Sequence, residues 1–203
     1  MKIAPMLTLI AATTFAVVGC SSPDKPEEEP SQTPEPIVSA ITYQGAPSSH
    51  AASEIADGTC FSTEGVDRTD PTEVARAFTL ISYCWDSVHD RTTTAATLRA
   101  KDLMNEQWVQ NLVEPERNAY QSMFNTAYQH QSYTSVHAEL APTDLNSSEG
   151  DRVTRVFLVD FTWQGRDGSV GSSVRLISTV YVEKNAEGKY EVTGQQMHGF
   201  EER

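Results

Sequence analysis

The sequence predicts an α+β domain in which N-terminal helices pack on a curved, cone-like antiparallel sheet of about four strands. Two observations predict this: apolar residues recur at helical spacing from Asp70 onward, and after residue 131 the pattern changes to the alternation of β-strands. Because the helices come first, we expect them on one face of the sheet. The domain would span residues 70–196, between an irregular segment at 37–69 and a frayed tail at 197–203.

The helical part begins at a strong start signal. Asp70 suits the N-cap, Pro71 the first helical position, and Glu73 follows three residues after the cap. An apolar face then recurs every three or four residues, at Val74, Phe78, Ile81, Trp85 and Val88. Three shorter helices are expected after it: over Thr94–Met104, from the cap Asn105, and from Pro115.

The sheet is predicted from segments rich in β-branched and aromatic residues. In Val153–Trp163, the odd positions from Phe157 to Trp163 alternate with the even ones, as in a strand with two different faces. The other strands, separated by glycine-containing turns, are expected at Tyr133–Leu140, Val174–Val182 and Tyr190–Gln196.

The first twenty residues have the pattern of a bacterial export signal. Lys2 gives a positive start, residues 3–18 are uncharged and mostly apolar, and Gly19 precedes Cys20. This run is shorter than the roughly 20 residues of a membrane-spanning helix. Its end, Val17-Val18-Gly19-Cys20, resembles the lipobox of bacterial lipoproteins. The resemblance implies that residues 1–19 are a signal peptide that is removed, and that Cys20 carries a diacylglyceryl group.

A lipid on Cys20 would hold the chain to the outer face of the cell membrane, because two acyl chains anchor a protein firmly. Residues 20–36 are rich in Pro, Glu and Ser and lack aromatic residues, so we expect a disordered, extended tether. The alternatives are an uncleaved anchor or an ordinary signal with a chance cysteine.

The two remaining cysteines, Cys60 and Cys84, form a candidate disulfide, since exported proteins meet an oxidising compartment. The alternative is two free buried thiols. The net charge of −13 disfavours direct nucleic-acid binding. None of the five His lies four residues from another, and neither a nucleophile elbow nor a Gly-rich phosphate loop occurs. We therefore expect no metal, no cofactor and no catalytic residues.

One acid and three tryptophans form a candidate pocket: Asp160 with Trp85, Trp108 and Trp163. Asp160 lies in the most apolar strand, where a buried carboxyl with a raised pKa would act as a base. The favoured alternative places Asp160 on the opposite face from Phe157 and Phe161, exposed or paired with Arg175. Aromatic residues at helical spacing are also more often core than pocket lining.

The layout of residues 70–196 resembles the nuclear transport factor two-like superfamily, and more narrowly the extracytoplasmic domains of actinobacterial conjugation and type IV secretion proteins. The residues that carry the resemblance are Asp70-Pro71, Val74 to Phe78, Tyr83, Trp85-Asp86 and Leu98-Arg99-Ala100. It implies a domain that binds other proteins without catalysis, often as an oligomer. Those proteins usually have a transmembrane helix, whereas this chain has a lipobox.

Together these observations favour a non-catalytic, lipid-anchored scaffold or accessory domain of a cell-envelope assembly. Its partners would be the membrane, through the lipid, and envelope proteins, and it would expose an apolar patch. The alternative is a small-molecule-binding or enzymatic cone with a pocket between the sheet and the helices.

Overall fold

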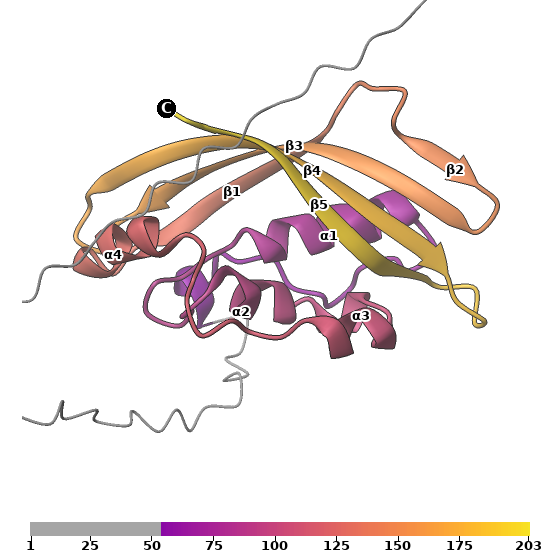
Figure 1. Cartoon of the computed structure of the whole chain (residues 1–203), viewed down its shortest axis with the longest axis horizontal. Coiled ribbons are helices and arrows are strands. Elements are labelled where there is room, and N and C mark those ends of the chain that lie inside the picture. Colours follow the sequence, from indigo (N-terminus) through magenta and orange to yellow (C-terminus); the bar gives the residue numbers. More distant parts are fainter. Residues whose placement is uncertain (1–53) are drawn as a thin grey trace, which may run out of the picture. The chain divides into compact units, whose positions relative to one another are not determined.

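The computed structural model describes residues 54–203, so the predicted signal peptide, Cys20 and the tether lie outside the described residues. The described part is an α+β domain in which helices cover one face of a curved antiparallel sheet (Figure 1). This confirms the predicted fold class. No helix of residues 54–203 is long and apolar enough to cross a membrane.

The helices precede the sheet, as expected. They are η1 (Ile55–Gly58), α1 (Pro71–Ser82), α2 (Thr93–Leu98), η2 (Lys101–Leu103), α3 (Glu106–Asn111) and α4 (Gln121–Gln129). The Asp70 carboxylate accepts hydrogen bonds from the backbone N–H groups of Thr72 and Glu73, and the Asn105 side chain accepts one from Trp108. Both predicted N-caps are therefore confirmed.

Three helix boundaries differ from the expectation. The helix α1 ends at Ser82 rather than running on to Val88, the expected second helix divides into α2 and η2, and α4 begins at Gln121 rather than at Pro115. The first difference has a clear cause, because Thr134 binds the chain just after α1. Its Oγ1 donates to the Tyr83 carbonyl (2.6 Å) and accepts from the Trp85 N–H (2.7 Å). Strand-like pairing thus replaces the last helical turns.

The sheet has the order β1-β3-β4-β5, with β2 also paired to β3, and every pair is antiparallel. The strands are β1 (Tyr133–Leu140), β2 (Ser147–Glu149), β3 (Arg152–Gln164), β4 (Val170–Lys184) and β5 (Tyr190–Glu202). The expectation of a frayed tail after residue 196 was wrong, because Met197–Glu202 pairs with β4. The short strand β2 was also not expected.

The core lies between the helices and the inner face of the sheet. Phe157, Val159, Phe161 and Trp163 of β3 are all at most 4% exposed, as the alternation predicted. Trp85 packs among them, with its ring 4.9 Å from Phe161 and 6.1 Å from Trp163. Val88, which was expected on the same face, is 52% exposed because α1 has already ended.

The N-cap of α1 gives a first test of the fold. We expect Asp70→Ala to lower the free energy of unfolding by about 1 kcal/mol, since two N–H groups of the first turn lose their acceptor. Urea denaturation followed by circular dichroism measures this. The control is Asp144→Ala, whose exposed side chain caps no helix, and an equal loss in both variants would contradict the assignment.

Candidate functional site

The carboxylate of Asp86 is a buried charged group, 0% exposed, that accepts four hydrogen bonds. Two guanidinium nitrogens of Arg166 bind it: Nη2 to Oδ2 at 2.8 Å and Nη1 to Oδ1 at 3.2 Å. The backbone N–H groups of Ala56 and Val88 add bonds of 2.8 and 3.0 Å. Burial alone would raise the pKa of Asp86, but the bonds from Arg166 and the two N–H groups outweigh it and lower the pKa.

This carboxylate joins three distant parts of the chain: the η1 turn, the segment after α1 and the β3–β4 hairpin. In η1, Ala56 and Asp57 have φ of 51° and 54°, values that are unfavourable for residues with a Cβ. Both are tied to the network, since Ala56 donates to Asp86 and the Asp57 carboxylate accepts from Arg166 Nε at 2.9 Å. The network thus offsets the strain of the turn.

A second buried pair lies beside the first. Arg99 binds the Asp90 carboxylate and the Cys84 carbonyl, and Asp90 also accepts from the Asp86 N–H at 2.8 Å. Burial raises the pKa of Asp90, although Arg99 opposes the shift. All of these contacts hold the backbone between α1 and α2, so the two pairs fix the conformation of this segment.

The two cysteines with a predicted disulfide lie together. Cys60 Sγ is 4.0 Å from the Cys84 carbonyl oxygen, and both residues belong to a small buried cluster with Ile55 and Ala56. A hydrogen bond from the Cys84 thiol lowers the pKa of Cys60, and Arg99 lowers it further. Both residues are free thiols in the structure. The disulfide therefore stays a prediction.

The four residues of the predicted pocket do not come together. Trp85 and Trp163 are in contact within the core, whereas Trp108 packs on Phe78, with ring centroids 5.3 Å apart. Asp160 lies on the outer face of the sheet. Its carboxylate accepts two hydrogen bonds from Arg175, at 2.7 and 2.8 Å, as the favoured alternative predicted.

Asp160 belongs to a row of polar side chains across the outer face. Successive strands pair His137 with Asp160, Asp160 with Arg175, and Arg175 with Glu201. Hydrogen bonds from Arg175 lower the pKa of Asp160, so this carboxylate is ionised and paired. The row is a cross-strand ladder of opposite charges, which does not fit a general base.

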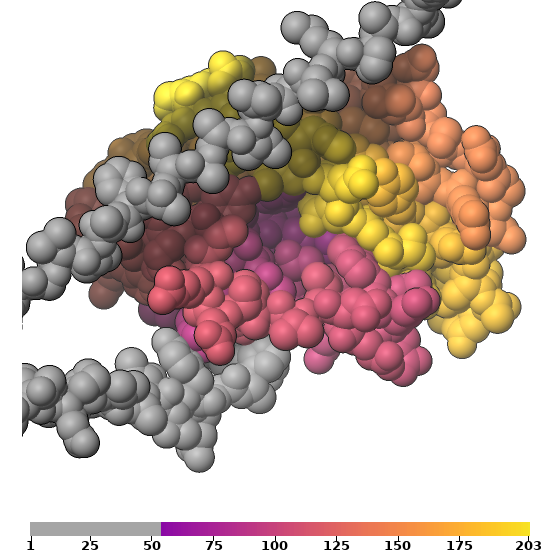
Figure 2. Space-filling view, in the orientation of Figure 1, coloured from indigo at the N-terminus to yellow at the C-terminus, as the bar shows by residue number. Residues whose placement is uncertain are grey.

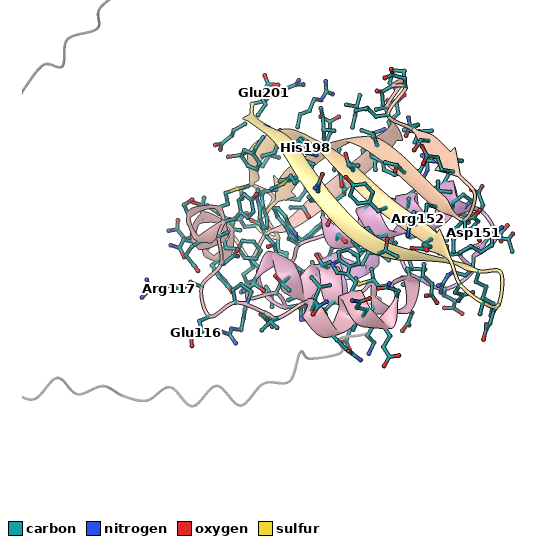
Figure 3. The ribbon with its side chains drawn as sticks, turned by 45° about the vertical axis from the view of Figure 1, so that its right-hand side comes forward. Glu116, Arg117, Asp151, Arg152, His198 and Glu201 are labelled. Carbon is teal, nitrogen blue, oxygen red and sulfur yellow. The ribbon has the colours of Figure 1, made fainter. Side chains whose placement is uncertain are left out.

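Exposed apolar side chains gather instead at the end of β5. Met197 and Phe200 are each 41% exposed. Tyr120 holds both from the helix side: its ring stacks on Phe200 with centroids 5.7 Å apart, and its hydroxyl lies 3.4 Å from the Met197 sulfur. Figure 3 shows His198 and Glu201 on the same strand. Residues 196–202 are all exposed, so this end of β5 is the candidate interaction surface.

Sequence reasoning missed the partner of Asp86. The sequence points to Trp85-Asp86 only through the family resemblance, and Arg166 belongs to one of the glycine-containing turns predicted between the strands. No local signal singled out Arg166, since Gly165-Arg166-Asp167-Gly168 has the composition of an ordinary hairpin turn. Its partner lies 80 positions away in the chain, and spacing rules do not reach that far. Within residues 54–203, no group of three or more His, Cys, Asp or Glu is placed to hold a metal ion.

The network predicts a large difference between two acid-to-alanine variants. Asp86→Ala leaves the half-buried Arg166 with Asp57 as its remaining carboxylate partner and removes the acceptor of the Ala56 and Val88 N–H groups, so we expect about 3–5 kcal/mol of lost stability. Asp160→Ala removes an exposed pair and should cost under about 1 kcal/mol. Because Asp86 has a lower pKa folded than unfolded, its contribution is complete above about pH 4 and is lost as the pH falls further. Urea denaturation from pH 3 to 7 tests both points, and equal losses would contradict the network.

The cysteine pair predicts a redox-dependent mass and stability. We expect Cys60 and Cys84 to form a disulfide by exchange with the disulfide of an oxidoreductase, which takes up their two electrons and two protons. Reduction of the isolated protein should then raise its mass by about 2 Da. Closing this loop of 25 residues would stabilise the domain by about 3 kcal/mol. Cys60→Ser and Cys84→Ser should each abolish the mass change. An unchanged mass in the parent protein would establish the free thiols.

Comparison of the chain with protein-family models, with curated proteins and with solved structures found no match. The resemblances to bacterial lipoproteins and to the nuclear transport factor two-like superfamily therefore stay predictions. The functional assignment depends on the geometry of the described residues and on the motif at Cys20.

Proposed function

We propose that this chain is a lipid-anchored, extracytoplasmic, protein-binding domain of a cell-envelope assembly, and that it is not an enzyme. The observation that carries this proposal is the end of β5, where seven consecutive residues, 196–202, are exposed on an edge strand. The partner adds an extended segment of its own chain along this edge.

The two halves of β5 differ in how their free edge is covered. In the first half, the Val192 carbonyl accepts from the Asn105 N–H at 3.0 Å, and the Tyr190 N–H donates to the Arg68 carbonyl at 2.7 Å. Beyond Val192, no other described segment except β4 forms a backbone hydrogen bond with β5. Proteins normally cover such an edge or protect it with charged residues, proline or a bulge. An edge that remains free can bind an extended peptide as an additional strand.

Apolar anchors accompany the open backbone. Met197 and Phe200 lie beside it, and Tyr120 holds them in place rather than leaving them free to move. Aromatic and methionine side chains fixed in this way are typical centres of binding energy in protein interfaces. The edge supplies the affinity of a β-strand addition, and the two side chains supply selectivity.

The charge of the chain defines the partner further. The chain carries a net charge of −13, whereas Glu201, at the exposed end of β5 (Figure 3), is already paired with Arg203 at 3.5 Å. The attraction therefore comes from the charge of the whole chain, which favours a basic partner segment and repels an acidic one. A lipid on Cys20, with residues 20–36 as a tether, would keep the domain near such envelope proteins.

Site-specific photocrosslinking in cells tests this proposal. A photoreactive amino acid replaces His198 on β5 or, as a control, Leu145, which is 65% exposed on a loop away from this strand. We expect a protein adduct from position 198 and none from position 145. Mass spectrometry of the adduct should locate the crosslink in a basic, extended segment.

A synthetic peptide of the captured segment then gives the quantitative test. Phe200→Ser should weaken binding of that peptide by about tenfold or more, as for an anchor residue, whereas Leu145→Ser should leave it unchanged. Equal crosslinking from both positions, or a peptide affinity that Phe200→Ser leaves unchanged, would refute the β5 interface. Loss of membrane association in Cys20→Ser tests the anchor separately.

A further inference from the structure

A cavity of about 390 Å³ lies between α4 and the start of β4, separate from the residues of the β5 anchors. Figure 1 shows α4 beside the end of the β3–β4 hairpin, and Figure 2 gives the surface in the same view. The volume falls in the range of small-molecule sites, near its lower end. The cavity therefore has the size for one small ligand.

Hydroxyl groups are the main polar feature of its walls. They come from both sides of the cavity: Ser122 and Thr126 from α4, Ser132 from the start of the sheet, and Ser169 and Ser172 from the hairpin. Each hydroxyl both donates and accepts hydrogen bonds. The Thr126 hydroxyl already donates to the Ser122 carbonyl at 3.4 Å and the Ser169 hydroxyl to the Asp167 carboxylate, so these two offer a ligand their acceptor sites. Such a lining matches a ligand whose own groups also do both.

Trp163 gives the cavity an aromatic wall with an unused donor. It is 4% exposed, and its Nε1 is buried without a hydrogen-bond partner among the described residues. Buried donors of this kind usually have an acceptor. Opposite Trp163 the strands contain a bulge, and a Cβ on Gly171 would lie only 3.0 Å from the Trp163 Cβ. Glycine at this position lets β4 approach the indole, and bulges often accompany binding sites.

His130 lines the cavity and is fixed by Asp167 of the hairpin. His130 Nδ1 lies 2.8 Å from Asp167 Oδ2. Hydrogen bonds from Ser169 and from His130 keep the pKa of Asp167 well below its usual value, so the carboxylate is ionised and accepts from Nδ1–H. Glu202 contributes the carboxylate of the cavity.

The charges of the lining exclude several ligand classes. No Lys or Arg is among the described residues that line it, so a phosphate or carboxylate ligand would lack a cationic partner. A single carboxylate is too few for a divalent cation, which takes several oxygen ligands. Five hydroxyls, one imidazole and an indole instead suit a neutral ligand with many hydroxyl groups.

We propose that this cavity binds a neutral sugar unit, through hydrogen bonds from its serine and threonine hydroxyls and packing against Trp163. The hydroxyls of the sugar form hydrogen bonds with the hydroxyls of α4 and the hairpin. Its C–H groups pack against Met123, Ala127 and Val170. The cavity shares Glu202 with the exposed end of β5 but contains none of Met197, Phe200 and Tyr120.

Ligand-observed saturation-transfer NMR and calorimetry on the full-length chain test the proposal. The probes are glucose, galactose, N-acetylglucosamine, cellobiose and chitobiose, with glucose 6-phosphate as the anionic comparator. We expect at least one neutral sugar to bind with a Kd on the order of 1 mM, as for a small polar ligand, and the phosphate to bind at least tenfold more weakly. No binding of any neutral sugar up to 50-fold that concentration, or tighter binding of the phosphate, would overturn it.

A matched pair of variants on α4 locates the site. Thr126→Trp would fill the cavity from an exposed helical position, whereas Asn125→Trp adds the same bulk one residue away and outside the lining. Binding should be lost in the first and kept in the second. Ser172→Ala, which removes one hydroxyl, should weaken it by about threefold or more. Equal binding in both tryptophan variants would place the sugar elsewhere and refute the assignment.

Discussion

The buried carboxylate of Asp86 is the interaction on which the rest of the structure depends. It sits just after α1, at the point where the chain stops being helical and pairs with β1, and an isolated bridge joins it to Tyr133. A buried charge is tolerated only when hydrogen bonds replace the water it has lost. Here two bonds from the Arg166 guanidinium and one each from the backbone N–H groups of Ala56 and Val88 do so. The carboxylate therefore fixes η1, the end of α1 and the β3–β4 hairpin at once.

The segment Trp85-Asp86 also determines where both proposed binding surfaces lie. Arg166 reaches Asp86 from the hairpin turn, and its backbone N–H donates to the His130 carbonyl at 3.1 Å, directly after α4. The hairpin is thereby held next to α4, and the hydroxyl-lined cavity is the space left between them. On the other side, Trp85 is fixed by Thr134 and supports Tyr120, whose ring lies 5.9 Å away. Tyr120 in turn orients Met197 and Phe200 on β5. The Asp86–Arg166 pair thus supports the cavity, and the neighbouring Trp85, held by Thr134, supports the end of β5.

Local rules predicted the features that depend on neighbouring residues. The caps Asp70 and Asn105, the inner face of β3 and the pairing of Asp160 with Arg175 all follow from spacings of one to four residues or from a hairpin. The errors arose where distant residues decide. The α1 helix ends early because Thr134 captures the backbone some 50 residues before it in the chain, and the last strand is longer because β4 offers a partner up to Glu202. The cavity could not be predicted either, since its walls come from α4, the hairpin and the end of β5.

The acidity of the chain bears on why β5 can remain open at its end. A long exposed edge strand can pair with the same strand of a second copy of the chain. A protein with a large net charge of one sign resists this pairing by electrostatic repulsion. Two copies of this chain would bring together two edges of a protein whose net charge is −13. The same repulsion disappears for a basic segment, which gains attraction instead. The charge therefore disfavours self-pairing and favours a chemically different partner, so that an edge which would otherwise be a liability becomes selective for one kind of protein.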